Sequence, residues 1–350
     1  MGRDADVVVI GAGIAGAAAA RALAQARRDV LVLEQFEPGH TRGSSHGSSR
    51  IFRLSYPDAA YVQLAQRALA AWHELEAEHG QSLITHSGSL DFGGMVERNA
   101  KALASCGARY ELLDGREVSA RWQIAADINE LVLYQPDGGV TRADRATSAL
   151  LAGALAAGAE LRAHTRVQSM RQEPRRILVE TEDDVVRGKV AVVTAGAWAR
   201  ALLAPLGIDL PVVPTRETVA YFRLAGAEQL PAVIDHALAR AGRTPFGVAA
   251  PGTGVKAGIH HSGPVTDPDE IGAPDKGLVG RISAWVERRL PEADPSLLRS
   301  ETCLYTNTDD ESFVLERHGR VVIGSACSGH GFKFAPVIGQ KLALLATEVS

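Results

Sequence analysis

The feature that most limits how this chain can fold is a glycine-rich turn close to its N-terminus. The turn follows a run of β-branched residues, Val7–Ile10, which is typical of a parallel strand covered on both faces. Gly11, Gly13 and Gly16 then follow at the spacing G-x-G-x-x-G, and the next residues, 17–26, are rich in alanine. This order predicts a strand, a tight turn and a helix packed closely on the strand.

A second apolar strand, Val30–Leu33, ends in the acidic residue Glu34. An acid at this position can accept hydrogen bonds from both hydroxyls of a ribose. The N–H groups at the helix start, from Ile14 to Ala17, would attract the phosphates of a dinucleotide. We therefore predict an ADP-binding βαβ unit. The spacing leaves NAD and FAD open, and the alternative is a glycine turn in an ordinary α/β domain.

Composition narrows the class of protein. The length of 350 residues suggests about two domains, and the net charge of −4 gives no reason to expect nucleic acid or an anionic membrane as a partner. No apolar run is long enough to span a bilayer, and the N-terminus shows no cleavable signal. The three cysteines, Cys106, Cys303 and Cys327, form no C-x-x-C pair. We expect a cytoplasmic protein without disulfides and without a metal site.

The pattern of expected helices and strands changes twice along the chain. Residues 145–206 continue the α/β pattern, with an expected strand at 160–167 and a strand and glycine turn at 190–198. Extended segments interrupted by proline then run from 212 to 261, which favours antiparallel strands. The last 50 residues return to a strand, a glycine loop and a helix. We predict two interleaved domains: residues 1–85, 143–211 and 310–350 form an α/β dinucleotide-binding domain, and residues 86–142 and 212–309 form a mainly antiparallel α+β domain.

Three further segments carry residues that could do chemistry. The first is a long polar loop, residues 37–50, which ends at Arg50 and leads into a short apolar element, residues 51–54, that contains Arg53. If residues 50–53 form a helical turn, both guanidinium groups project from one side. The alternative is two solvated surface arginines.

The second segment is an expected strand at residues 254–260. Lys256, Gly258 and His260 share one face of that strand, because side chains alternate between faces. The bare glycine between them would leave room for a planar group. The alternative is a strand whose polar side faces water.

The third segment, residues 324–334, places Lys333 between two phenylalanines in a glycine-rich loop. Pro336 then favours a helix start, whose positive end would stabilise a negative charge. Cys303 stands alone, and a lone cysteine is usually a small buried apolar residue.

Together these segments resemble one family, the monomeric sarcosine oxidase and N-methyltryptophan oxidase group of flavoproteins. The resemblance covers nearly the whole chain in order. It rests on the N-terminal glycines, residues 43–53 (GSSHGSSRIFR), Lys256 with His260, residues 303–306 (CLYT) and residues 329–334 (GHGFKF). It implies a Rossmann-like FAD-binding domain interleaved with a substrate domain.

The resemblance also implies roles for individual residues. It makes FAD the cofactor and Cys303 its covalent attachment point. It implies that Arg53 and Lys333 hold the substrate carboxylate, and that Lys256 activates oxygen beside the basic residue Arg50. His260 matches the family's active-site histidine. The cofactor-binding positions are Gly11, Gly13, Ile14, Gly16, Glu34, Ser44, His46, Arg50, Val167, Cys303, Gly329, Gly331 and Lys333.

Three features depart from the family pattern. The family's sarcosine oxidases carry an aromatic hydroxyl on the strand before the lysine, whereas residues 244–248 here read TPFGV, with Phe246. Ser45 stands where close relatives have a histidine beside the flavin. Family chains usually continue past the last helix, and this sequence ends at Ser350.

We therefore expect an FAD-dependent oxidase that converts a secondary amino acid, N-methylated or cyclic, and O2 to an imine and H2O2. It would act as a monomer on a small amino-acid substrate. Three alternatives remain: an oxidase of primary or glycated amines, a flavin-binding protein without turnover, and an NAD-linked dehydrogenase.

Overall fold

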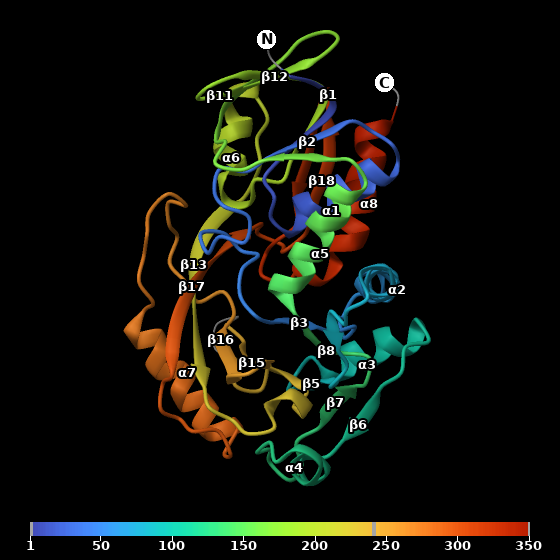
Figure 1. The fold of residues 1–350 in the computed structure, drawn as a ribbon. Coiled ribbons are helices and arrows are strands. Elements are labelled where there is room, and N and C mark those ends of the chain that lie inside the picture. The colour runs from blue at the N-terminus through green and yellow to red at the C-terminus, as the bar shows by residue number, and fades with distance from the viewer. Residues whose placement is uncertain (1–2, 240–242, 349–350) are drawn as a thin grey trace.

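The computed structural model describes residues 3–239 and 243–348. Within these residues the strands form two eight-stranded sheets and one three-stranded sheet. In Figure 1 the first large sheet occupies the upper half of the molecule and the second the lower half. The fold is thus mixed α/β, as the sequence predicts.

The first sheet is built around the predicted N-terminal unit. β1 (Asp4–Ile10) lies between β12 (Val185–Val193) and β2 (Val30–Leu33), and both pairings are parallel. β9 (Glu160–Arg162) extends the sheet in parallel beyond β2. β12 therefore joins the sheet of the glycine turn, as expected from the sequence.

The remaining strands of this sheet lie beyond β12. One of them, β19 (Val321–Ser325), pairs with β12 in parallel. β18 (Val314–His318), β10 (Val167–Gln172) and β11 (Ile177–Thr181) join as antiparallel strands. The expectation of one strand over residues 160–167 is wrong: His164, at φ 51°, lies in a turn, so β9 and β10 occupy different positions in the sheet.

Helices cover the first sheet. α1 (Ile14–Gln25) packs against both α5 (Ala143–Ala156) and α8 (Ala335–Thr347), which stand together in Figure 1. Small residues on both helices permit this close packing. A Cβ on Gly339 of α8 would lie 2.4 Å from the backbone of Ala18 on α1. On the opposite face, α6 (Ala199–Leu203) lies between the 3₁₀ turns Gly196–Trp198 and Ala204–Leu206.

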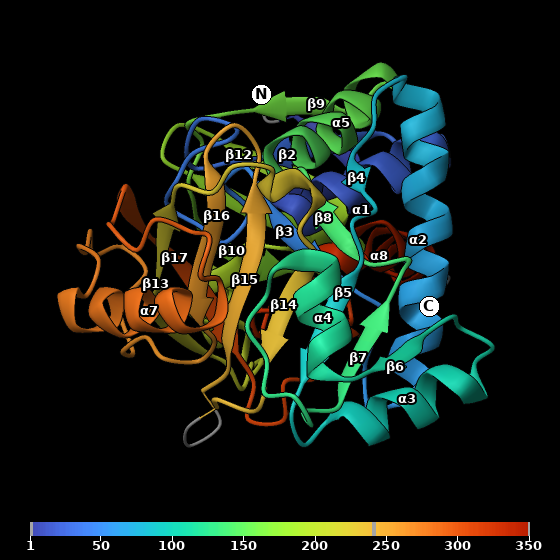
Figure 2. The same cartoon turned by 90° about the horizontal axis from the view of Figure 1, so that it is seen from below.

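The second sheet supplies the other large layer. Its strands follow the order β17-β13-β16-β15-β14-β5-β7-β6, and only the pairing of β14 with β5 is parallel. Figure 2 shows β13 to β16 side by side, with α7 (Lys276–Arg289) crossing them. The bounds are β5 Ser89–Phe92, β6 Glu111–Leu113, β7 Val132–Gln135, β13 Val213–Phe222, β14 Ala232–Asp235, β15 Pro245–Ala250, β16 Gly254–Ile259 and β17 Arg299–Asn307.

Three more helices flank these layers. α2 (Ala59–His79) runs along one side of the molecule in Figure 2 and packs on α8 and on α3 (Val96–Ser105). Asp58 caps α2 at its start by accepting the N–H of Ala60 at 2.8 Å, and Gly80 ends it in a left-handed conformation. α4 (Gly115–Trp122) contributes Val118 to the apolar cluster that contains Leu90 of β5 and Val132 of β7.

The third sheet consists of β3 (Arg50–Phe52), β8 (Gly139–Thr141) and β4 (Ile84–Thr85). The helical turn considered for residues 50–53 is therefore wrong. Pairing with β8 holds this segment extended. Because β3 and β4 come from the first predicted domain and β8 from the second, this small sheet ties the two together.

The two large sheets draw their strands from different parts of the chain. Every strand of the first sheet comes from residues 1–85, 143–211 or 310–350, and every strand of the second from 86–142 or 212–309. We propose these ranges as the domain boundaries. Residues 1–2, 240–242 and 349–350 of the predicted ranges lie outside the described residues. None of the helices formed by the described residues has the length and apolar character needed to cross a membrane.

Candidate functional site

A cavity of about 780 Å³ is lined by residues from both large sheets. This volume is within the usual range for a cofactor or small-molecule site. The predicted site residues that line it are Gly11, Gly13, Ile14, Glu34, Ser44, His46, Arg50, Arg53, Val167, Lys256, His260, Cys303, Gly329, Gly331 and Lys333. The structure therefore brings together residues that are up to about 320 positions apart in sequence.

Gly16 does not line the cavity, and its geometry gives it a packing role. A Cβ on Gly16 would lie 1.8 Å from the carbonyl oxygen of Gly11, so no other residue fits there. Gly11 has φ 96°, a conformation that favours glycine, and its Cβ would meet the carbonyl of Thr194 at 2.7 Å. Together these glycines bring α1 down onto the sheet.

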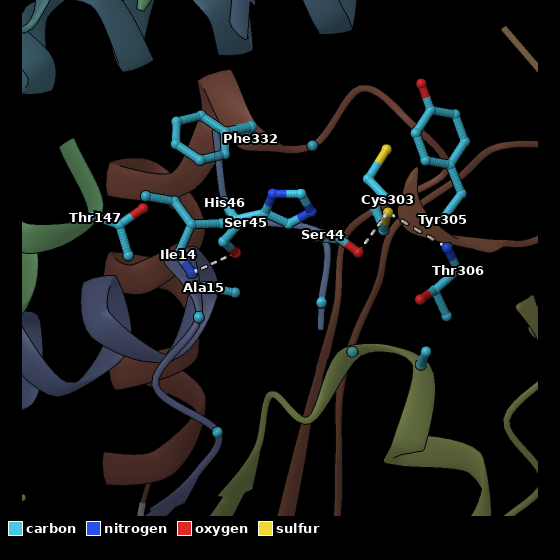
Figure 3. Close-up of a pocket in the computed structure, with 18 of the residues that line it drawn as sticks. Ile14, Ala15, Ser44, Ser45, His46, Thr147, Cys303, Tyr305, Thr306 and Phe332 are labelled. Carbon is cyan, nitrogen blue, oxygen red and sulfur yellow. Dashed lines mark hydrogen bonds between the residues drawn. The ribbon is translucent and has the colours of Figure 1, made fainter. Parts of the chain in front are cut away.

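Polar groups already hold the turn in shape. Glu34 is buried, and its carboxylate accepts the N–H groups of Ala12 at 2.7 Å and Phe36 at 3.0 Å. The N–H of Ile14, at the start of α1, donates to the hydroxyl of Ser45 at 2.9 Å (Figure 3). Ser45, one of the departures from the family pattern, thus caps the helix that was expected to face phosphates.

The loop before β3 folds around the guanidinium of Arg50. Arg50 donates to the carbonyl oxygens of Ser44 and His46, both at 2.7 Å, and of Ser49 at 2.8 Å. Arg50 is thus not a free surface residue, because it closes the loop on itself. Burial, with Arg50 as a second cause, lowers the pKa of His46 to about 4, so this imidazole is neutral at physiological pH.

Three buried polar atoms on the cavity wall have no hydrogen-bond partner among the described residues. They are Nε2 of His46, Oγ of Ser49 and Oγ1 of Thr306. Buried polar groups are nearly always satisfied, and an orphaned group points to a ligand or water. The residues therefore fit a polar cofactor bound across the cavity.

Cys303 lies on β17 at the wall of this cavity, with Ser44 and Tyr305 nearby in Figure 3. The hydroxyl of Ser44 donates to the carbonyl of Leu304, which fixes the loop to the strand. Burial raises the pKa of Cys303, and the charges of Arg50 and Lys256 oppose that rise. The thiol is thus on the cavity wall beside two cationic side chains.

Lys256 lies on β16 with its ammonium buried. Its Nζ donates to the carbonyl of Ser49 at 3.4 Å, and burial, followed by the charge of Arg50, lowers the pKa of Lys256 to about 7. Val255 and Ala257 face the core behind the strand, as the predicted alternation requires. The alternative of a polar face in water is wrong, because both Lys256 and His260 face the cavity.

The space expected beside Gly258 is occupied. A Cβ on Gly258 would lie 2.7 Å from the ring of Phe246, which comes from the neighbouring strand β15. The glycine therefore makes room for this phenyl ring and not for a ligand. Phe246 also lines the cavity and gives it an apolar wall between Lys256 and His260.

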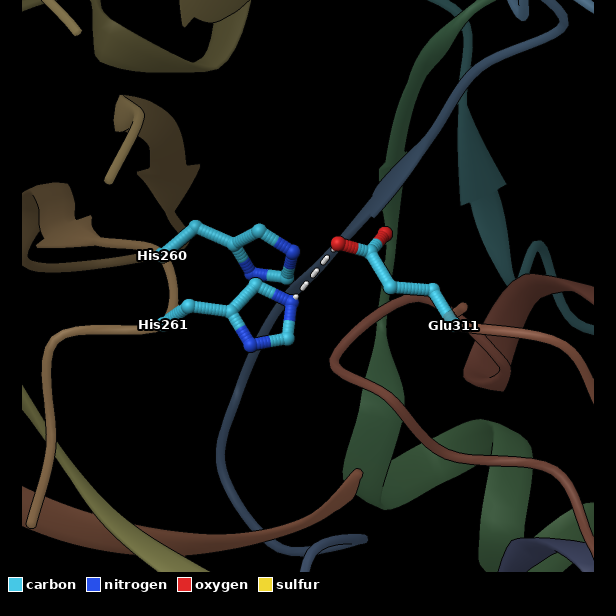
Figure 4. Close-up of side chains that lie close together, drawn as sticks. All are labelled: His260, His261 and Glu311. Carbon is cyan, nitrogen blue, oxygen red and sulfur yellow. Dashed lines mark ion pairs between the residues drawn. The ribbon is translucent and has the colours of Figure 1, made fainter. Parts of the chain in front are cut away.

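His260, His261 and Glu311 form a cluster beside the cavity (Figure 4). Their nitrogen and carboxylate atoms lie within 4.8 Å of one another, a donor set that metal ions use. His261 Nε2 lies 3.2 Å from the carboxylate of Glu311, close enough for these two side chains to pair directly. Burial and the adjacent His261 lower the pKa of His260 to about 3, which keeps His260 neutral.

Arg53 and Lys333 converge on one tyrosine. The guanidinium carbon of Arg53 lies 4.4 Å from the ring centre of Tyr56, and Nζ of Lys333 donates to the Tyr56 hydroxyl at 2.9 Å. Lys333 also donates to the carbonyl of His330 at 2.8 Å. Burial, and then the charge of Arg53, lowers the pKa of Lys333 well below its usual value. Two basic groups thus share one end of the cavity.

The structure adds residues that the sequence did not single out. Asp91 is fully buried on β5, where it accepts hydrogen bonds from Arg53 at 3.3 Å and from Ser55 at 2.5 Å. Trp72 of α2 donates its ring N–H to the carbonyl of Lys333 at 2.7 Å. In the sequence, the one sign that Asp91 belongs to the site is its charge, because it stands between the apolar residues Leu90 and Phe92 of a strand.

Comparison with known proteins agrees with this geometry. Residues 6–345 match the family described as "FAD dependent oxidoreductase". The monomeric sarcosine oxidase of Bacillus sp. (strain B-0618) is 33% identical, over 97% of this chain and 92% of its own. The N-methyl-L-tryptophan oxidase of Yersinia pestis (strain Pestoides F) is 29% identical, over 99% of this chain and 95% of its own.

A solved structure has the same architecture. NikD, described as an unusual amino acid oxidase essential for nikkomycin biosynthesis, superimposes with a TM-score of 0.89 at 30% identity. The match covers 99% of this chain and 94% of that one. The arrangement of sheets and helices described above is therefore that of an FAD-dependent amino acid oxidase.

Proposed function

This chain belongs to the FAD dependent oxidoreductase family, and on that basis we propose that it oxidises a secondary amino acid, N-methylated or cyclic, with O2 as the acceptor. When bound, FAD would supply a two-electron oxidation of the CH–NH group of the amine to C=N, and O2 would take up the two electrons and two protons. The products are an imine, which hydrolyses in water, and H2O2. The observation that carries the proposal is the pair of basic groups, Arg53 and Lys333, in the same cavity as Lys256 and Cys303.

Residues of the glycine turn would hold the nucleotide half of the cofactor. Gly11, Gly13 and Ile14 line the cavity at the start of α1, where the helix dipole favours phosphate. Glu34 and Val167 line the same part, on strands β2 and β10 or beside them. Gly16 contributes by packing alone. Ser44 donates to the carbonyl of Leu304, next to Cys303, and we assign Ser44, His46, Gly329 and Gly331 to the flavin half.

Arg53 and Lys333 would bind the substrate carboxylate. A guanidinium can form two parallel hydrogen bonds to a carboxylate, and an ammonium adds a point charge. Because Tyr56 touches both groups, it sets the spacing between them. Fixing the carboxylate orients the amine and its neighbouring carbon, which is how positioning lowers a barrier. Phe246 makes the pocket wall apolar.

Lys256 and Arg50 would stabilise negative charge as O2 is reduced, since both are cationic groups in a site of low polarity. His260 would meet the substrate as a neutral imidazole, held by the hydroxyl of Tyr305 at 3.4 Å. No side chain has to act as a general base if the amine binds in its free form. We expect the enzyme to work as a cytoplasmic monomer.

Cys303 is our candidate for a covalent link to the flavin. Its thiol lies on the cavity wall, as does that of Cys327. Burial raises the pKa of Cys303, and the nearby cations Arg50 and Lys256 oppose that rise and so favour the thiolate that such a link requires. Acid precipitation of the native protein should leave the yellow colour in the pellet, whereas the Cys303→Ala protein should release it. Cys106→Ala, which changes a cysteine outside the cavity, is the matched control. Colour in the native supernatant would refute the link.

The proposed activity is tested by peroxide release over a panel of amines. The panel contains sarcosine, other N-methyl amino acids, proline and pipecolate, with glycine and a glycated amino acid added. We expect H2O2 from the secondary amines first. Release from glycine or the glycated compound alone would favour the alternative oxidase. Silence across the panel, together with confirmed FAD and no anaerobic bleaching, would leave a flavin-binding protein without turnover.

A further inference from the structure

Lys256 belongs to a row of side chains that crosses three neighbouring strands. Tyr221 on β13 stands directly opposite Lys256 on β16 and directly opposite Arg299 on β17. The guanidinium carbon of Arg299 lies 3.6 Å from the centre of the Tyr221 ring, and Nζ of Lys256 lies 6.0 Å from it on the other side of the row. The tyrosine therefore separates a cation near the surface from a buried one.

Glu301 completes this row. It lies two residues after Arg299 on β17, so the two side chains share a face of the strand, and they form an ion pair at 2.6 Å. Its Oε1 accepts the hydroxyl of Tyr221. Oε1 of Glu301 and Nζ of Lys256 each lie 3.7 Å from the point where a Cβ on Gly47 would stand. The carboxylate thus sits close to Lys256.

Exposure differs sharply along this row. The side chain of Arg299 is 47% exposed and that of Glu301 25%, whereas Lys256 is only 5% exposed. A buried ammonium loses much of its hydration, which favours its neutral form. Arg50 works in the same direction, as a like charge. A nearby negative charge must oppose both effects if Lys256 is to stay charged.

We propose that Glu301 is a positioning residue that keeps Lys256 in its cationic form, acting from the edge strand β17 on the same face of the sheet, with Tyr221 and Arg299 holding its carboxylate in place. The inference rests on the proposed function, in which the charge of Lys256 assists the reduction of O2. Glu301 does not line the cavity. It would act through Lys256 and not by touching substrate or cofactor.

Two carboxylates raise the pKa of Lys256, and Glu301 has a larger effect than Asp144. Burial would raise the pKa of Glu301, but Tyr221 and Lys256 lower it overall, so Glu301 is an anion. The Cys303 thiol, its pKa raised by burial, is largely neutral. The charged or titratable groups that face Lys256 are Arg50 on β3, His46 in the preceding loop, Tyr221 on β13, Cys303, Glu301 and Arg299 on β17 and Asp144 on α5.

The experiment is an NMR titration of lysine side chains labelled with ¹³C at Cε. The chain has six lysines, and the Lys256→Met protein assigns the signal of Lys256. In Glu301→Gln, which keeps the size of the side chain, the pKa of Lys256 should fall by about one pH unit. Tyr221→Phe should lower it less, because the carboxylate remains but loses one of its donors.

Two controls sharpen the outcome. Glu311→Gln removes a carboxylate that lines the same cavity but pairs with His261, and it should leave the Lys256 signal in place. Glu301→Asp keeps the charge and should largely restore the native value. An unchanged Lys256 titration in Glu301→Gln overturns the inference, as does an equal shift in Glu311→Gln.

A kinetic measurement separates this inference from the proposed function. Reoxidation of the reduced enzyme by O2 should slow as pH rises through the pKa of Lys256, and in Glu301→Gln this fall should begin at lower pH. Reduction by substrate should keep its pH profile. If native holoenzyme releases no peroxide across the amine panel, the proposed function fails while the NMR titration still decides the role of Glu301.

Discussion

At the residue scale, the site is built from buried charged side chains. Each would lower stability if it were buried alone, and each has a polar or charged partner. Arg53 is 17% exposed and meets the fully buried Asp91, and Lys333 is buried against Tyr56. Burial raises the pKa of Asp91, while Arg53 and Ser55 oppose that rise. Breaking such a pair leaves one charge without a partner, which costs more than the pair contributes.

Asp91→Asn tests whether this pair orients Arg53. We expect the KM for a carboxylate substrate to rise about tenfold with little change in kcat, because a hydrogen bond to a charged group contributes about 1.5–3 kcal/mol. Steady-state kinetics against the native enzyme checks this. Asp137→Asn, which removes a carboxylate that pairs with Arg109, is the control. A lower KM in Asp91→Asn would mean that Asp91 competes with the substrate for Arg53.

At the element scale, the long helix α2 reaches the site without lining the cavity. Its buried Trp72 donates to the carbonyl of Lys333, in the 3₁₀ turn Phe332–Phe334 that precedes α8. The register of α2 against this turn therefore fixes where the ammonium of Lys333 points. The buried face of α2, which carries Val62, Ala65, Ala68, Trp72 and Leu75, is part of the hydrophobic core. Its link to Lys333 depends on packing.

Trp72→Phe tests this link, since it removes the N–H donor and keeps an aromatic ring. We expect the free energy of unfolding to fall by about 1–3 kcal/mol, because the Lys333 carbonyl loses its partner and the smaller ring leaves space. The KM for the carboxylate substrate should rise as well. Denaturant unfolding and kinetics measure the two effects. Trp122→Phe, on α4, is the control and should leave KM unchanged. An unchanged KM in Trp72→Phe would mean that α2 only adds stability.

At the scale of the whole molecule, the cavity gathers histidines that the fold keeps neutral. Burial is the first cause in each case, and it lowers the pKa of His46, His236 and His330 to about 4 and that of His260 to about 3. An unfolded chain would bind protons at these positions at about pH 6.5. Between these values the unfolded state holds more protons than the native state.

Stability should therefore fall on acidification from about pH 6.5 to about pH 4. Each histidine contributes a slope of up to about 1.4 kcal/mol per pH unit, and the sign is positive because stability rises with pH where the unfolded state binds more protons. Urea unfolding of the holoenzyme across this range measures the slope. His330→Gln should flatten it, whereas His73→Gln, an exposed position, should not. A flat native profile would contradict the burial of these groups.

The sequence by itself determined the N-terminal unit, because its glycines and β-branched strand follow local rules. Gly11 needs its positive φ, and Gly16 lies against the carbonyl of Gly11 a few residues away. The alternation that puts Lys256 and His260 on one face is equally local. The family resemblance then supplied the remaining site residues. Of all the predicted site residues, every one except Gly16 lines one cavity.

The tertiary structure alone decided which partners these residues meet. Asp91 and Arg53 lie 38 positions apart and Tyr221 and Glu301 lie 80 apart, and strand order and register set both encounters. Phe246 fills the space beside Gly258 because β15 pairs with β16 in one register. The glycine turn holds its shape through local contacts, whereas the charge of Lys256 depends on a carboxylate from another strand.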